Sequence, residues 1–306
     1  MNAERIVSLL PGGTDIVCAL GLEDRLVGIS AECDQPASVM DRPRVSLSLL
    51  DTGDAEAAEI DRRVRDRLAA GEPLFRADHE ALAALRPDLI LSQSLCDVCA
   101  ATPDALTAAA VGDARVLALD GRDLDGLLAD IHTVAAAAGA TAHGQALVDR
   151  LVERRLAIGT PPAPRPRVLT VEWPDPLFIG GHWVPDMVVA AGGAPLGQPG
   201  AHSTTVSWEA VQAFDPQVIL IMPCGEDLTG AADALASLRR RPGWPALTAV
   251  QSAAVYLLDG NRHFSRPGPS AFTGLEIIAH ILGTGQQDPA AGYWRPASPS
   301  EYRADR

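Results

Sequence analysis

The feature that most constrains the fold is an internal duplication. Residues 79–91 read HEALAALRPDLIL and residues 208–220 read WEAVQAFDPQVIL. Each segment has the pattern of a short amphipathic helix, a proline-containing breaker and a buried strand rich in aliphatic residues. Two further pairs of similar segments occur in the same order along the chain: 5–11 with 167–173, and 114–121 with 254–260. This shared order indicates two copies of one structural unit.

Strands that alternate with helices predict parallel sheets covered by helices, so we expect an α/β fold with two Rossmann-like lobes. Residues 124–158 are rich in Ala and Leu, have helical spacing and contain no proline, and TPPAPRP at 160–166 ends that pattern. We therefore expect one long helix to join the lobes. The expected organisation is an N-terminal lobe (1–138), a bridging helix (139–160), a C-terminal lobe (161–285) and a surface tail (286–306).

The charge of the chain excludes several classes of function. Asp and Glu number 39 against 25 basic residues, giving a formal charge of −14, and every basic residue is arginine. Such an acidic protein repels a phosphate backbone, so we expect no nucleic-acid partner. Without lysine, neither Schiff-base chemistry nor a phosphate-loop lysine is possible.

Location is predicted from the apolar runs of the sequence. None reaches the eighteen or so residues of a membrane helix, so we expect a protein that is not embedded in a membrane. The first residues lack the basic and long apolar regions of a secretory signal. We expect a cytoplasmic protein if Met1 is the native start, and a periplasmic or otherwise extracytoplasmic one if the start is truncated.

The segment 171–185, VEWPDPLFIGGHWVP, carries the strongest sign of a ligand site. It leaves the C-terminal end of a predicted strand, where open α/β sheets bind ligands. It brings together an acid, an imidazole and aromatic rings: Glu172, Trp173, Phe178, His182 and Trp183. Alternatively, the two tryptophans pack the core of the lobe. Their occurrence with a histidine among glycines and prolines favours a surface that binds a ligand.

The segment 260–269, GNRHFSRPGP, follows another predicted strand. Hydrogen-bond donors and one aromatic face come from Arg262, His263, Phe264, Ser265 and Arg266. Such a loop can hold amides, carboxylates or a phosphate. A proline-stiffened turn with solvated arginines is an equally good interpretation.

Cysteines form a second candidate site. Cys96 and Cys99 are spaced as ligands of zinc or an iron–sulfur cluster, or as a redox couple. Cys33 and Cys224 follow other predicted strands and could converge on them, whereas Cys18 lies in a predicted helix. The alternative is that all five are small apolar residues in a reducing compartment. The sequence also lacks GxGxxG, GxxxxGK, GxSxG and HExxH motifs.

Several segments resemble a known family: 6–22 (IVSLLPGGTDIVCALGL), 86–91 (RPDLIL) and the WEAV…DPQVIL repeat. They are similar to class III substrate-binding proteins, which serve ABC importers of cobalamin, ferric siderophores and heme, and the likeness covers roughly residues 4–283. ECDQP, SQSLCDVCA, EWPDPLFIGGHWVPDMV, PCG and DGNRHFSRPGPS resemble the cobalamin-binding subgroup, whose members often lack a signal peptide. The resemblance implies two lobes bridged by a helix, with the ligand held between them.

The resemblance also implies roles for individual residues. Its motif positions assign corrinoid contacts to Glu172, Trp173, His182, Trp183, Trp208, Phe264, Ser265 and Arg266. The family docks its permease through one glutamate per lobe, and Glu80 and Glu209 match those places. Exposed first-turn carboxylates stabilised by the helix dipole are the alternative.

We therefore expect a monomeric, non-catalytic protein that binds cobalamin and carries no other cofactor, with an ABC permease as a further partner. The alternatives are a binder of ferric siderophore or heme, and a cytoplasmic enzyme or chaperone that handles a metal chelate through Cys96, Cys99 and His182. Cobalt coordination by His182 is a separate hypothesis that rests on residue type.

Overall fold

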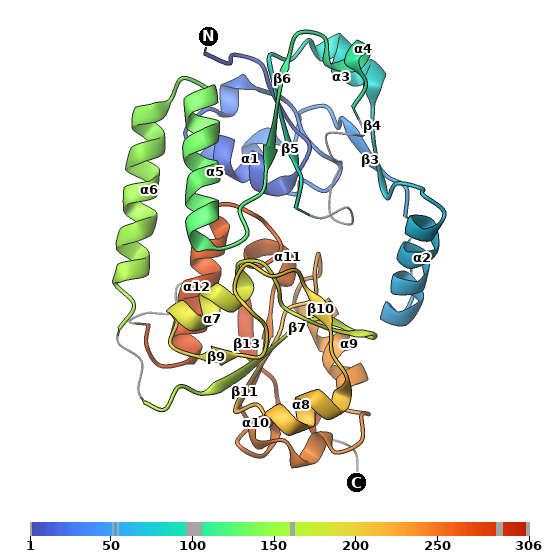
Figure 1. Ribbon diagram of the computed structural model, residues 1–306, viewed down its shortest axis with the longest axis vertical. Helices are drawn as coiled ribbons and strands as arrows, with labels where there is room; N and C mark the ends of the chain where they lie inside the picture. The colour runs from blue at the N-terminus through green and yellow to red at the C-terminus, as the bar shows by residue number, and fades with distance from the viewer. Residues whose placement is uncertain are drawn as a thin grey trace. The chain divides into compact units, whose positions relative to one another are not determined.

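The computed structural model describes residues 2–50, 52–53, 55–95, 106–159, 163–285 and 290–303. The chain divides into two compact units, each with its own sheet (Figure 1). The N-terminal lobe comprises Met1–Gly121, Asp125–Leu151 and Pro267–Pro269. The C-terminal lobe comprises Arg122–Leu124, Val152–Arg266 and Ser270–Arg306. Two α/β lobes with parallel strands confirm the expected fold class.

The N-terminal lobe is built on a parallel sheet with strand order β2-β1-β5-β6. All five residues of β5 are buried, as in parallel sheets covered on both faces. The strands are β1 (Ile6–Ser8), β2 (Leu26–Gly28), β5 (Leu89–Gln93), β6 (Arg115–Leu119) and a separate antiparallel pair, β3 (Ser46–Ser48) with β4 (Phe75–Ala77). The helices are α1 (Pro11–Ala19), α2 (Ala57–Ala69), α3 (His79–Leu85), α4 (Ala108–Val111), α5 (Leu124–Ala137) and α6 (Thr141–Leu156).

The C-terminal lobe has a mixed sheet with order β10-β8-β7-β11-β12-β13, and β9 pairs with β7. Its centre, β7-β11-β12, is parallel, whereas β8, β10 and β13 are antiparallel to their neighbours. The strands are β7 (Arg167–Pro174), β8 (Leu177–Ile179), β9 (Ala194–Pro195), β10 (Thr204–Thr205), β11 (Val218–Ile221), β12 (Val255–Leu258) and β13 (Trp294–Pro296). The helices are α7 (Val184–Ala190), α8 (Trp208–Phe214), α9 (Leu228–Leu238), α10 (Thr248–Gln251), α11 (Gly260–His263), α12 (Ser270–Ile281) and α13 (Pro299–Tyr302).

The duplicated segments adopt the same local structure in both lobes. Helices α3 and α8 each end at a residue in the left-handed conformation, Arg86 and Asp215, both with φ of 45°. An arginine at the start of the neighbouring strand then donates to the end of each helix. Arg5 Nη2 lies 2.6 Å from the Leu85 carbonyl oxygen, and Arg167 Nε lies 2.6 Å from that of Phe214. These bonds satisfy carbonyl groups that have no partner within the helix.

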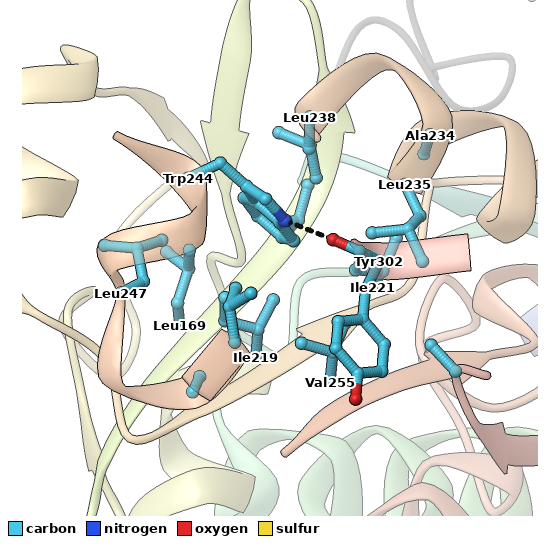
Figure 2. Packing of buried hydrophobic residues seen from close by; sticks show 14 of the residues in the cluster. Leu169, Ile219, Ile221, Ala234, Leu235, Leu238, Trp244, Leu247, Val255 and Tyr302 are labelled. Carbon is cyan, nitrogen blue, oxygen red and sulfur yellow. Dashed lines mark hydrogen bonds between the residues drawn. The ribbon is translucent and has the colours of Figure 1, made fainter. Parts of the chain in front are cut away.

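Two tryptophans form the centre of the C-terminal core. Trp244 is fully buried, and its indole N–H donates to the Tyr302 carbonyl oxygen at 2.7 Å (Figure 2). Trp208 stacks on Trp244 with ring centroids 6.2 Å apart and donates to the Pro242 carbonyl oxygen at 2.6 Å. Trp208 is 8% exposed, so packing accounts for this residue. Its expected ligand contact stays a prediction.

The expected surface tail also needs correction. Within residues 286–306, β13 pairs with β12, and Tyr302 of α13 is 1% exposed in the core. The reason is hydrophobic: Tyr302 buries a large ring in the core, and Trp294 is half-buried beside it along the chain. This stretch therefore completes the lobe instead of lying over it.

Helix α6 lies within the range expected for the bridging helix, and the boundary between the two units falls inside it, between Leu151 and Val152. Two short segments, Arg122–Leu124 and Pro267–Pro269, also change unit. The predicted domain boundaries did not include these two exchanges, because the lobe to which each segment belongs is decided by tertiary contacts. Among the described residues, no helix is both long and apolar enough to cross a membrane.

Candidate functional site

The loop between β8 and α7 is tied to the loop before β10 by backbone hydrogen bonds. His182 N donates to the Ala201 carbonyl oxygen at 2.6 Å, and Gly200 N donates to that of His182 at 3.0 Å. His182 itself has a positive φ of 54°. A Cβ on Gly181 would overlap the Ser203 backbone nitrogen, so only glycine allows this close approach. Both loops belong to the C-terminal lobe and are held in one arrangement.

Three side chains form a polar chain across these loops. Arg122 Nη1 lies 3.2 Å from His202 Nε2, and His202 Nδ1 lies 3.3 Å from His182 Nε2. A guanidinium only donates, so His202 Nε2 must accept through its lone pair. The proton of neutral His202 is then on Nδ1, which donates to His182 Nε2. His182 is left with its N–H on Nδ1.

The electrostatics around His182 favour its neutral form. The pKa of His182 is lowered from 6.5 to about 4, chiefly by burial and in smaller part by the nearby His202 and Arg122. Near neutral pH this imidazole is therefore uncharged. Its Nε2 lone pair is engaged with His202 and is not available to a metal while that bond persists. The arrangement argues against cobalt coordination by His182.

Glu172 is the carboxylate of the same loop pair. It accepts hydrogen bonds from the Ser203 hydroxyl and from Gly181 N, the latter at 3.3 Å. Burial raises the pKa of Glu172, and these two hydrogen bonds partly oppose that shift. Glu172 thus links the two loops from the end of β7 as an internal polar group.

The two segments that the sequence singled out meet inside the lobe. The Trp183 indole N–H donates to the Phe264 carbonyl oxygen at 3.0 Å, and both side chains are buried. Arg266 is 1% exposed and donates from Nε to the Asn261 carbonyl oxygen at 2.9 Å. Ser265 Oγ accepts from Gly225 N at 3.3 Å. Four residues expected to contact the ligand thus make hydrogen bonds within the lobe: Trp183, Phe264, Ser265 and Arg266. Trp173 and His182 keep part of their surface exposed.

The expected thiol site is not assembled among the described residues. Cys33 is buried, with its Sγ 3.2 Å from Thr14 Oγ1, and Cys224 is half-buried in the other lobe. Cys96 and Cys99 lie outside the described residues. Burial and nearby carboxylates raise the pKa of Cys18 to about 12, which disfavours its thiolate. No group of three or more His, Cys, Asp or Glu side chains in the described part of the chain could hold a metal.

Glu80 and Glu209 occupy equivalent places in the duplication. Each is exposed and is the second residue of its helix, α3 or α8. Asp78 and Ser207 cap these helices by accepting from the Ala81 and Ala210 amides. Their docking role stays a prediction.

Sequence reasoning missed the residues that complete the polar chain. Arg122 and His202 are separated by 80 residues and meet only in the folded lobe. A sequence signal existed for one of them, since His202 lies in QPGAHS, a glycine- and proline-containing loop like that of His182. Asp186 was also missed, and its Oδ2 accepts from Leu124 N at 3.0 Å at the start of α5.

Comparisons with known proteins support a common fold. A family model described as periplasmic binding protein matches residues 6–261. The periplasmic heme-binding protein BhuT in complex with two hemes is 24% identical (TM-score 0.68), and the similarity covers 92% of this chain and 98% of that one. The periplasmic heme-binding protein RhuT from Roseiflexus sp. RS-1 is 22% identical (TM-score 0.68; 92% and 98% covered). The periplasmic vitamin B12 binding protein BtuF of Vibrio cholerae is 22% identical (TM-score 0.62; 92% and 97% covered).

Among curated proteins, none matches this sequence. At identities below 25%, the structural likenesses show a shared fold, and they include proteins with different ligands. The description of the matching family as periplasmic gives no support to the expected cytoplasmic location.

Proposed function

Because this chain belongs to the periplasmic binding protein family, whose members bind solutes for ABC importers without catalysis, we propose that it is a corrinoid-binding protein with cobalamin as its ligand. Its role is then to hold the ligand by burial of ring surface and by a few oriented polar groups. A membrane permease of the ABC class is the corresponding partner.

The paired histidines of the loops that follow β8 and β9 carry this proposal. His182 is neutral near pH 7, and His202 accepts from Arg122 through a lone pair. Imidazole donors and acceptors suit the carboxamide side chains of a corrinoid. The resemblance of segments 172–188 and 259–270 to the cobalamin-binding subgroup supports the same ligand.

Heme is the second candidate, because two of the similar structures described above are heme-binding proteins. A ferric siderophore is a third candidate from the sequence resemblance. Both ligands carry charged groups or a metal ion that needs a protein ligand. The paired histidines offer neither a charge nor a free lone pair at His182 Nε2. An enzyme acting through Cys96 and Cys99 stays a prediction of the sequence.

The test is a titration of the purified protein with cyanocobalamin, hemin and ferrichrome, followed by calorimetry and visible absorption. We expect cyanocobalamin to bind one-to-one at micromolar or lower concentration, with no comparable binding of the other two. Binding of hemin or ferrichrome alone would overturn the proposed ligand, and turnover of bound cobalamin would overturn the non-catalytic role.

A further inference from the structure

We propose that a pocket in the C-terminal lobe receives the aromatic nucleotide base of the corrinoid, an inference that rests on the proposed function. The pocket lies between β8 and the segment that joins β9 to β10. Its walls are mostly apolar, and six of its lining residues matter to the argument: Ile179, Leu196, Gln198, Ala201, His202 and Val206. All of them belong to one lobe.

The size of the pocket selects one substituent of a large ligand. Its volume is about 330 Å³. Pockets that bury a complete drug-sized ligand range from about 300 to 1,000 Å³, so this one is at the small end. A corrin macrocycle with its side chains does not fit. A two-ring aromatic base such as 5,6-dimethylbenzimidazole is of suitable size.

The chemistry of the lining selects an uncharged group. Ile179, Leu196, Ala201 and Val206 offer apolar surface, and none of the lining side chains is acidic or an arginine. Arg122 Nη1 donates to His202 Nε2 and does not line the pocket. A carboxylate placed here would lose water without meeting an arginine in the lining, which is costly. An aromatic base would bury its ring at no such cost.

The walls of the pocket are formed before any ligand binds. Gly197 has no room for a side chain, since a Cβ there would lie 2.8 Å from the Gly180 carbonyl oxygen and 3.2 Å from Pro185 Cγ. The backbone bonds between His182 and residues 200–201 fix the adjoining loop. A preformed pocket loses little conformational freedom on binding, so less of the free energy gained by burying the ring is offset.

The experiment compares cobalamin with cobinamide, which has the same corrin ring but lacks the nucleotide base. Ala201→Trp and Thr204→Trp each place an indole at the exposed rim of the pocket, from two sides. Two variants are used because a single indole could turn outward. Ala213→Trp, at an exposed alanine of α8 away from the pocket, is the matched control. Thermal unfolding of each variant verifies that it is folded.

We expect the unaltered protein to bind cobalamin about tenfold or more tightly than cobinamide, because only cobalamin has an aromatic base to bury in the apolar pocket. At least one rim variant should weaken cobalamin binding to the level of cobinamide and leave cobinamide binding unchanged, whereas Ala213→Trp should alter neither. Equal affinity for both corrinoids, or a preference that survives both rim variants, overturns the inference and leaves the proposed function intact. Failure of both corrinoids to bind overturns the proposed function and the inference with it.

Discussion

At the scale of single residues, the hydrogen-bond direction imposed by one arginine determines the state of two histidines. Arg122 can only donate, so His202 accepts at Nε2 and donates from Nδ1 to His182. This chain of bonds occupies the Nε2 lone pair of His182, so we predict that this imidazole is a polar contact and not a metal ligand. Residue type alone allowed either role.

The first prediction concerns His182. We expect His182→Ala to leave the cobalt absorption bands of the cobalamin complex unchanged, because the Nε2 lone pair accepts from His202. The measurement is the visible spectrum of the purified complex, with the unaltered protein as reference. A shift of the bands in the variant would mean that His182 binds cobalt.

The second prediction concerns pH and His263. This residue is 5% exposed, and its Nε2 has no hydrogen-bond partner among the described residues. Burial lowers the pKa of His263 from 6.5 to about 4. The folded chain therefore binds this proton less tightly than the unfolded chain, so stability is complete above pH 6.5 and declines as the pH falls toward 4.

At about 1.4 kcal/mol per pKa unit, His263 accounts for a loss of at most about 3 kcal/mol. We expect His263→Gln to show a smaller decline in unfolding free energy between pH 7 and pH 4, measured by urea unfolding. His143→Gln, at an exposed position of α6, is the control and should follow the unaltered protein. Parallel pH profiles for all three proteins would contradict the prediction.

At the scale of elements, the duplication preserves a way of ending a helix. In both lobes a short helix ends in a residue with left-handed backbone conformation, and a proline follows it. An arginine at the start of the neighbouring strand, β1 or β7, then donates to the carbonyl groups at the helix end. Arg5 and Arg167 stand at equivalent places in the repeat. The planar fork of N–H groups on arginine holds two carbonyls in a fixed geometry, whereas the donors of a lysine sit on one rotating ammonium group.

The third prediction tests this arrangement. Arg167 donates to the carbonyl oxygens of Phe214 and Asp215, at 2.6 and 2.8 Å from its Nε. We expect Arg167→Ala to lower the unfolding free energy by about 1–2 kcal/mol, seen as a fall of a few degrees in Tm by circular dichroism. Arg115→Ala, at an exposed position at the start of β6, should change Tm little. Equal Tm values for the two variants would show that the helix end does not depend on Arg167.

The fourth prediction concerns the last elements of the chain. Tyr302 is 1% exposed, and its carbonyl oxygen accepts from Trp244. Truncating a buried ring leaves a cavity, so we expect Tyr302→Ala to destabilise the C-terminal lobe by about 3 kcal/mol or more. Tyr293→Ala, whose ring is 40% exposed, serves as the control and should cost clearly less in urea unfolding. Similar losses in both variants would indicate that the tail is not part of the core.

At the scale of the whole molecule, duplication gives two lobes with equivalent exposed glutamates. Glu80 and Glu209 each stand in the first turn of their helix, where the helix dipole stabilises a negative charge. Neither side chain contributes to the core, so both remain available to a partner. Membership of a family that serves ABC importers makes a permease with matching arginines the proposed partner.

The fifth prediction separates docking from ligand binding. The double variant Glu80→Ala/Glu209→Ala should bind cobalamin as tightly as the unaltered protein but lose association with an ABC permease in membrane vesicles. Co-sedimentation measures the association, and calorimetry measures the ligand affinity. The pair Glu56→Ala/Glu72→Ala, at exposed positions flanking α2, is the control. Association that survives in the first double variant would rule out a docking role for this pair.

The sequence by itself determined the duplication, the α/β class and the segments that matter. Helix-breaker-strand patterns are local, and burial of both faces of a parallel sheet leaves a continuous apolar run that can be read directly, as in β5. The expected loops at 171–185 and 260–269 do meet, through Trp183 and Phe264. For the same local reason, equivalent places for Glu80 and Glu209 were visible in the repeat.

Only the tertiary structure decided which aromatic side chains are core and which polar groups pair. Trp208 and Tyr302 look the same in sequence whether they face a ligand or a core, and their partners lie far along the chain. The link between Arg122 and His202 spans 80 residues, so no spacing rule reveals it. Local periodicity carries information about elements, whereas hydrogen-bond direction and burial depend on neighbours that folding alone brings together.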